Sequence, residues 1–332
     1  MPLSAHLSGP LSAMSINGLR AMTLCLATVS AGIAHAADRG MSFIGASRAS
    51  AGDINFAADS LASAGGDVQF ALLPFEFNPG DPFANVSTLV HSALPRVTGV
   101  LRVTVYVKWF PHDAAGNADQ AEFWKAWNAD KPSLDQQRIR QGFMSRVAKA
   151  NDWVAEVRAW AARRGMDDHL GITLVPVLED TCPASKDDGY QRLINAVIAA
   201  QAADGVKTRL RRSCLHENIF RVSGASLELH GPWSLCKSRL QSGDTWCNDG
   251  THYDGTPNGD GTRFTAVQFV SSQRDARSRG VNVMYWDAAY NGSPTGTDYV
   301  LRRNWAQRTV NPFTGANKAN ERQILSKIVT SR

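Results

Sequence analysis

The chain has 332 residues, of which 43% are hydrophobic and 20% are charged, a composition that allows a sizeable folded core. Its formal net charge of +5 is a mild bias for this length, so we expect no nucleic-acid partner. The composition is that of an ordinary globular chain.

The N-terminal segment has the pattern of a secretory signal peptide. Arg20 precedes a short apolar run at 21–34, and Ala34-His35-Ala36 provides small residues for cleavage. The run is too short and too rich in Ala, Ser and Thr to span a bilayer stably. We therefore expect a signal peptide at 1–36, a mature chain at 37–332 without membrane insertion, and a secreted or periplasmic location.

Strand-like apolar runs alternate with helical patterns along the mature chain. The strand-like runs cover 42–45, 68–75, 100–109, 171–178, 219–222, 226–229 and 281–286. Helical spacing marks 53–64, 83–94, 190–203, 266–279 and 319–329, and a long helix carries Ile139, Phe143, Val147, Val154 and Val157 on one face and ends near Gly165. The polar segment 242–262 reads as a loop. This alternation predicts one α/β domain with a mainly parallel sheet.

Two architectures fit this alternation, an open doubly wound sheet and a closed (β/α)8 barrel. The open sheet usually carries a glycine-rich phosphate loop, and neither G-x-G-x-x-G nor G-x-x-x-x-G-K-[ST] occurs here. The sequence therefore favours a single TIM-like (β/α)8 barrel with loop insertions. About seven strands are evident, so we expect an eighth near 207–212 or 308–313. The basic run 207–212 reads as a solvated strand edge or loop.

Four cysteines remain after signal cleavage, an even set in an oxidising compartment. Four cysteines allow three pairings. We expect two disulfides and prefer Cys236–Cys247, which closes a polar loop, with Cys182–Cys214 as the second. No C-x-x-C motif suggests zinc or thiol chemistry, and we expect neither metal nor cofactor.

Acidic residues lie in or directly after several of the predicted strands. Glu179 follows the run at 171–178, Glu228 lies in the run at 226–229, and Asp287 follows the run at 281–286. In a barrel, the C-terminal strand ends meet at one face, where catalytic residues lie. Glycoside hydrolysis needs two carboxylates, one that protonates the leaving oxygen and one that attacks or activates water. The sequence predicts Glu179 as the acid/base, with Glu228 or Asp287 as the second carboxylate. The other interpretation is that such acids cap helices or pair with arginine.

Aromatic residues near the same strand ends support a carbohydrate substrate. Flat aromatic faces stack on sugar rings, while polar neighbours bond the hydroxyls. We expect the substrate-binding residues to be Trp109, Trp233, Trp286 and Tyr290, with His230 and Arg48 as polar contacts. Four tryptophans on helical segments are expected in the core instead: Trp124, Trp127, Trp153 and Trp160.

With these residues, the chain resembles the broad superfamily of secreted bacterial (β/α)8 glycoside hydrolases. The resemblance implies a cofactor-independent glycosidase, here expected to be a monomer, acting on an extracellular or cell-envelope polysaccharide. In the large retaining clan, Asn precedes the acid/base Glu, and the nucleophile is a Glu after strand seven. Here Leu178 precedes Glu179 and the late strand leads to Asp287. The resemblance therefore implies only that two carboxylates act together, and not the specific residue pattern of that clan.

Two alternatives stay open. A non-catalytic glycan-binding barrel would keep the aromatic face without two carboxylates at catalytic separation. A secreted esterase or phosphodiesterase would need a Ser–His or metal cluster assembled by the fold, since neither G-x-S-x-G nor H-E-x-x-H occurs. A carboxylate separation of about 5–5.5 Å or about 6.5–9.5 Å would favour a retaining or an inverting glycosidase, respectively.

Overall fold

The computed structural model describes part of the chain, within the second of its two units, Met1–Ala36 and Ala37–Arg332. The described residues are 39–42, 68–72, 74–77, 80–177, 189–215, 222–230, 233–240, 245–249, 274–276 and 278–286. None of the helices in these ranges combines the length and apolar character needed to cross a bilayer. The signal segment lies outside them, so cleavage after Ala36 stays a prediction.

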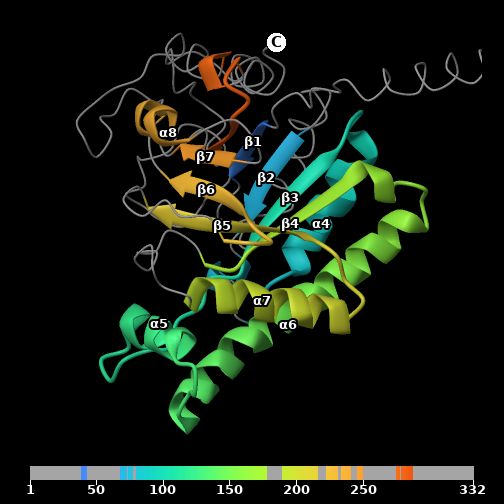
Figure 1. Ribbon diagram of the computed structural model, residues 1–332. Helices are drawn as coiled ribbons and strands as arrows, with labels where there is room; N and C mark the ends of the chain where they lie inside the picture. Colours follow the sequence, from blue (N-terminus) through green and yellow to red (C-terminus); the bar gives the residue numbers. More distant parts are fainter. Residues whose placement is uncertain are drawn as a thin grey trace, which may run out of the picture. The chain divides into compact units, whose positions relative to one another are not determined.

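Eight parallel strands form one sheet in which every strand pairs with the next along the chain (Figure 1). They are β1 (Arg39–Ser42), β2 (Val68–Leu72), β3 (Leu101–Tyr106), β4 (Leu170–Val175), β5 (Arg209–Leu215), β6 (Ser226–His230), β7 (Thr245–Asp249) and β8 (Asn282–Trp286). β8 also pairs in parallel with β1, as in a closed barrel. Followed once round the sheet, the register is staggered by about eight residues, the shear of a TIM barrel.

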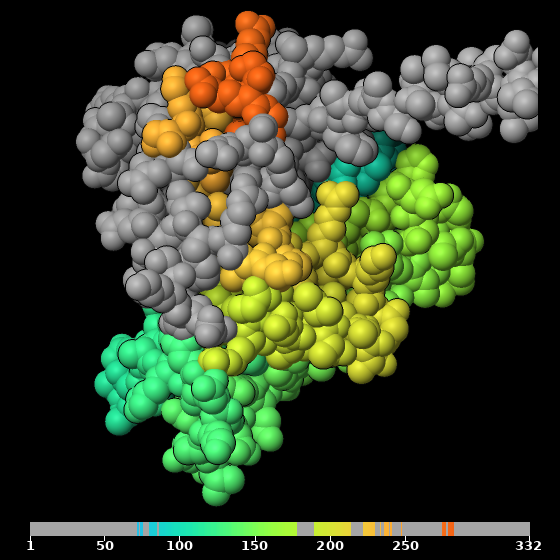
Figure 2. Space-filling view, in the orientation of Figure 1, coloured from blue at the N-terminus to red at the C-terminus, as the bar shows by residue number. Residues whose placement is uncertain are grey.

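The described helices lie between the strands in sequence. They are α3 (Pro74–Phe77), α4 (Ala84–Ala93), α5 (Gln120–Asn128), α6 (Leu134–Ala162), α7 (Gly189–Ala203) and α8 (Trp233–Arg239), with 3-10 turns η3 (Leu94–Arg96) and η4 (Asp167–His169). α5, α6 and α7 pack against one another and form a continuous surface (Figure 2). The predicted α/β fold with parallel strands is confirmed.

The residue alternation in β3 explains how the strand is packed on both faces. Leu101, Val103 and Val105 belong to the apolar core. Thr104 and Tyr106, at alternate positions, contact side chains of β5 and β6 in the barrel interior. Period-two alternation therefore separates an apolar outer face from a polar inner face.

Helix α6 begins and ends at sequence signals. Ser133 accepts a hydrogen bond from the Gln136 backbone N–H, and the Gln136 side chain accepts one from the Ser133 N–H, so the two form a capping box. Gly165 follows the helix with φ +68°, the left-handed conformation that glycine adopts most readily. The Met166 N–H donates to the Ala161 carbonyl, which closes the last turn as predicted.

An aromatic cluster joins the three packed helices. Phe123 of α5 lies edge-on to Trp124 and to Phe143 of α6, with ring centroids 5.0 and 5.7 Å away. Trp124 also stacks on Tyr190 of α7 at 5.3 Å. These rings give close edge-to-face packing in addition to their buried apolar area. The core positions predicted for Trp124, Trp127 and Trp153 are confirmed, and Trp160 is partly buried against the same core.

Two segments differ from the sequence predictions. The segment expected as a polar loop contains β7, a short strand whose hydrophobicity is low and which is defined by its pairing with β6 and β8. The basic run at 207–212 leads into the missing strand, β5; its predicted solvated character holds for Lys207 and Arg209, which are exposed, and is wrong for Arg211 and Arg212. Arg211 and Arg212 are only 2% and 1% exposed, because β5 lies inside the sheet with partners on both sides.

One of the two predicted disulfides is confirmed. Cys236 of α8 and Cys247 of β7 are bonded, with their Cα atoms 5.8 Å apart. Cys182 lies outside the described residues, and only the backbone of Cys214 is described, so the second pairing stays a prediction.

Candidate active site

Glu228 lies in the barrel interior, in the middle of β6, and its side chain is fully buried. The hydroxyl of Tyr106, at the end of β3, donates a hydrogen bond to Glu228 Oε1 at 2.6 Å. The Ser213 hydroxyl of β5 lies 3.4 Å from the same oxygen. Arg211 Nη1 lies 3.0 Å from Oε2. Both carboxylate oxygens are therefore held by protein donors from other strands.

Arg211 provides the positive charge of this interior cluster. Its side chain is 3% exposed, and Nη1 also lies 3.5 Å from the Thr104 hydroxyl of β3. A buried ion pair costs desolvation on both sides and is maintained only with good geometry and further hydrogen bonds. Tyr106 and Ser213 supply those bonds to the carboxylate.

The next residue of β5 points to the opposite face. The Arg212 guanidinium lies over the Tyr190 ring of α7, 5.1 Å from its centroid. Burial lowers the pKa of Arg212 to about 10, which still leaves it protonated at neutral pH. Alternation thus directs Arg211 into the barrel and Arg212 toward the helix layer.

The segment after β3 carries an unusual backbone. Lys108 has φ +31°, the one non-glycine residue with positive φ among the described residues. Its carbonyl accepts a hydrogen bond from Arg146 of α6 at 2.8 Å, which helps to hold the turn. Burial also lowers the pKa of Arg146. Strained backbone of this kind is concentrated at functional sites, so the C-terminal end of β3 is a candidate part of one.

Trp109 follows this turn and is partly buried. Its ring lies close to Gly142 of α6, where an added Cβ would be 2.7 Å from ring atoms Cη2 and Cζ2. Its centroid is 6.4 Å from that of Phe123. The absence of a side chain at position 142 therefore sets the position of the indole at the C-terminal end of β3.

Trp233 lies in a different environment. It is 4% exposed, and its indole N–H donates to Asp275 Oδ2 at 3.1 Å. Asp275 also accepts from Arg279 and lies 3.4 Å from the Lys237 ammonium. The hydrogen bond from Arg279 is the largest cause of the lowered pKa of Asp275, and burial opposes it in part. Trp233 packs as a core residue and has no exposed ring face on which a sugar could stack.

The other predicted site residues are only partly covered by the described ranges. Glu179, Asp287, Tyr290 and Arg48 lie outside them, and His230 and Trp286 are described by backbone alone. In sequence, Glu179 is four residues after the end of β4 and Asp287 directly follows β8. Because all strands are parallel, the ends of β4 and β8 lie at the same end of the barrel.

Sequence reasoning missed Tyr106, Arg211 and Ser213 as partners of Glu228. Their positions at alternate residues of β3 and β5 were the available signal, since polar side chains at period two in an otherwise buried strand indicate an interior polar face. In the ranges that the structure describes, no group of three His, Cys, Asp or Glu side chains could hold a metal ion.

Comparison with known proteins identifies similar structures but no sequence relatives. No family model matches the chain, and no curated protein matches it. A glycoside hydrolase family 5 enzyme from Prevotella bryantii B14 is 11% identical, with coverage of 83% of this chain and 86% of that chain and a TM-score of 0.45. A GH113 β-1,4-mannanase is 12% identical, with coverage of 89% and 98% and a TM-score of 0.46. A GH5-4 broad specificity endoglucanase from Bacteroides salanitronis is 14% identical, with 85% coverage of both chains and a TM-score of 0.42.

All three neighbours are glycoside hydrolases, of families 5 and 113. Identities and TM-scores this low assign no activity to the present chain.

Proposed function

We propose that the mature chain is a secreted or periplasmic glycoside hydrolase that cleaves an extracellular or cell-envelope polysaccharide with two carboxylates. The observation that carries this proposal is the parallel direction of β4 and β8, which precede Glu179 and Asp287. Parallel strands in a barrel bring residues that are far apart in sequence to one face. Glu179 acts as the general acid/base, and a second carboxylate attacks the anomeric carbon or activates water.

Asp287 is the preferred second carboxylate. Glu228 is fully buried, and both of its oxygens already accept hydrogen bonds or an ion pair from Tyr106 and Arg211. A catalytic carboxylate needs an oxygen within reach of the sugar, about 3 Å from the reacting atom. Glu228 is therefore assigned to the interior of the barrel, where its charge and that of Arg211 support the strands around the site.

The sugar subsites lie around the same strand ends. Trp109 follows the strained turn after β3, and its indole is held by its close approach to Gly142. Trp286 ends β8, and Tyr290 follows Asp287 closely in sequence. Aromatic faces there would stack on sugar rings, with His230 and Arg48 as hydroxyl contacts. The substrate is a polysaccharide or oligosaccharide, and the chemistry requires no cofactor.

The proposal is tested with residues 37–332 and a panel of bacterial and plant polysaccharides. Reducing-sugar release is compared between the wild type, Glu179→Gln and Glu122→Gln, an exposed control carboxylate on α5. We expect release by the wild type and by the control, and a loss of at least about 100-fold in Glu179→Gln, since a general acid contributes that much or more. Binding without release from any glycan would instead support the non-catalytic barrel.

A further inference from the structure

A cavity of ≈ 580 Å³ opens at the N-terminal end of the barrel. It is lined by the first residues of β4, β5 and β6, so it lies at the opposite end from the strand ends that precede Glu179 and Asp287. Its volume is within the range of small-molecule sites, about 300–1,000 Å³. In TIM barrels this end ordinarily serves stability, so a formed cavity there calls for a separate explanation.

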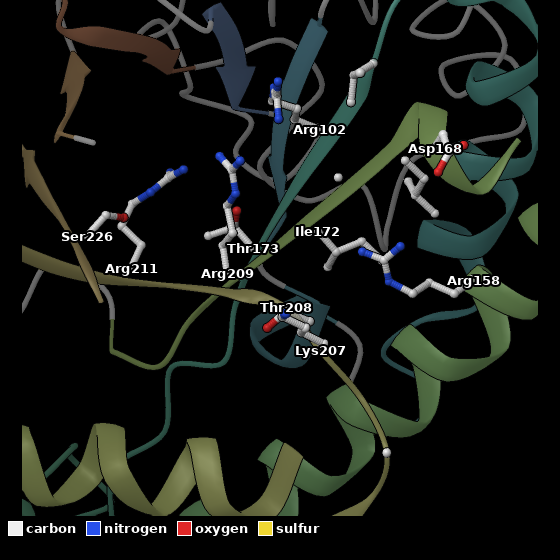
Figure 3. A pocket seen from close by; sticks show the side chains of 14 residues that line it. Arg102, Arg158, Asp168, Ile172, Thr173, Lys207, Thr208, Arg209, Arg211 and Ser226 are labelled. Atoms are coloured by element: carbon white, nitrogen blue, oxygen red, sulfur yellow. The ribbon is translucent and has the colours of Figure 1, made fainter. Parts of the chain in front are cut away.

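Positive side chains dominate the lining. Five are basic and one is acidic: Arg102, Arg158, Lys207, Arg209 and Arg211, against Asp168. Figure 3 shows Arg102 of β3 and both Arg209 and Arg211 of β5 extending toward the same space. Cations gathered around a concave, low-dielectric wall raise the local concentration of anions.

Part of this charge is compensated and part is not. Arg211 pairs with Glu228, and Arg158 pairs with Asp167 at 3.0 Å. Lys207 and Arg209 form no salt bridge with any carboxylate of the described residues, and both are exposed toward solvent. The cavity therefore has a buried cation, Arg211, at its inner wall and uncompensated cations at its mouth.

The groups that complete the lining suit a small hydroxylated anion. Thr173 of β4 and Ser226 of β6 supply hydroxyls within the cavity wall. Arginine forks bind phosphate and carboxylate groups through paired, charge-assisted hydrogen bonds. A neutral sugar could accept hydrogen bonds from the three arginines of this wall but would leave their charge uncompensated, whereas an oxyanion would accept the bonds and also offset the charge.

From this geometry we propose that the N-terminal cavity is a binding site for a small oxyanion-bearing molecule, a phosphate or a carboxylate, with Arg209 and Lys207 as its principal charge contacts. The inference does not depend on the proposed glycosidase activity, because it concerns the other end of the barrel. The experiment below measures anion binding only. A negative result would therefore exclude the anion site without bearing on the proposed glycosidase activity.

The test measures binding to residues 37–332 by titration calorimetry at low salt, with inorganic phosphate, glucuronate, glucose 6-phosphate and neutral glucose as separate probes. We expect saturable binding of phosphate, glucuronate or both, which weakens as salt increases. The tighter of the two identifies the preferred oxyanion, and glucose 6-phosphate shows whether a sugar body adds affinity. Glucose should show no saturable binding.

Substitutions then locate the site. Arg209→Gln should weaken anion binding at least about tenfold, and Lys207→Gln should weaken it less, as expected for the loss of a charge-assisted bond and of a nearby charge. Arg163→Gln and Lys149→Gln, exposed cations outside the cavity, are the matched controls. Absence of anion binding, equal binding of glucose and glucuronate, or equal affinities in the cavity and control variants would overturn the proposal. Unchanged thermal unfolding of each variant shows that a loss is local.

Discussion

Arg211 and Glu228 form an ion pair at 3.0 Å inside the barrel, with side chains that are 3% and 0% exposed. The pair joins β5 to β6, and the Tyr106 hydroxyl extends it across the interior to β3. Removal of one member of a buried pair leaves the other charge without compensation in a site of low dielectric.

Glu228→Gln should therefore lower the free energy of unfolding by about 3–5 kcal/mol, measured by urea denaturation. The double variant Arg211→Met with Glu228→Gln should be less destabilised than the sum of the two single variants, because it leaves no buried charge. The control is Asp135→Asn, which breaks the exposed pair with Arg138 and should change stability by less than about 0.5 kcal/mol. If the loss in the double variant equalled the sum of the losses in the two single variants, the two charges would not stabilise each other.

The ionised Asp275 carboxylate should make the free energy of unfolding depend on pH in the acidic range. Its folded pKa is lowered, chiefly by the hydrogen bond from Arg279, so the unfolded chain binds its proton more readily. The stabilisation is therefore fully present above the ordinary pKa of 3.8 and is lost as the pH falls through the lower folded value.

Asp275→Asn should be less stable than the wild type at pH 6, and the difference should shrink below about pH 4. Urea unfolding across pH 2.5–7 measures it, with Asp135→Asn as an exposed control. A difference that stays constant down to the lowest pH would show that Asp275 contributes no pH-dependent stability.

The Cys236–Cys247 bond should stabilise the region where α8 meets β7. Cys236→Ser, Cys247→Ser and the double variant should each lower the free energy of unfolding by about 2–4 kcal/mol, because all three remove the same cross-link. Equal losses in the single and double variants are the expected signature, read by thermal unfolding under oxidising conditions. Single variants as stable as the wild type would show that the bond contributes nothing to stability.

Gly142 should control the position of Trp109. In an exposed helix position Gly→Ala stabilises by about 1 kcal/mol, but here the new Cβ would meet the indole at 2.7 Å. Gly142→Ala should therefore shift the tryptophan fluorescence and weaken glycan binding, and Trp109→Ala should weaken glycan binding in the same way. Gln141→Ala, on an exposed position of the same helix, is the control. Unchanged fluorescence and glycan affinity in Gly142→Ala would remove Trp109 from the subsites.

Periodicity predicted β3, β4, α6 and α7 well, because each of these elements carries its own pattern. β3 and β4 alternate or run apolar over six residues, and α6 has both its cap and its terminating glycine in the sequence. β5 and β7 lack that signal. β5 is basic because its inner face meets Glu228 and the N-terminal cavity, and β7 is defined by its neighbours in the sheet.

The candidate site shows the same division. Acidic residues at strand ends can be recognised in the sequence. Which side chains they pair with can be predicted only when the register of several strands is known. Arg211 and Glu228 are 17 residues apart, and Tyr106 is 122 residues from Glu228, so neither contact has a local signal. Glu228 was thus identified as a candidate carboxylate, while the three donors that hold it in the interior were not.

The decisive measurement for the roles of Glu179 and Asp287 is the pH dependence of kcat/KM on the glycan that is cleaved fastest. If these two carboxylates act as acid/base and as nucleophile or base, the wild type should show a bell-shaped profile. Glu179→Gln should lose the basic limb and Asp287→Asn the acidic limb, each with a rate reduction of at least about 100-fold. Glu228→Gln should keep both limbs if it folds. Wild-type rates and an unchanged profile in Glu179→Gln and Asp287→Asn would contradict these roles.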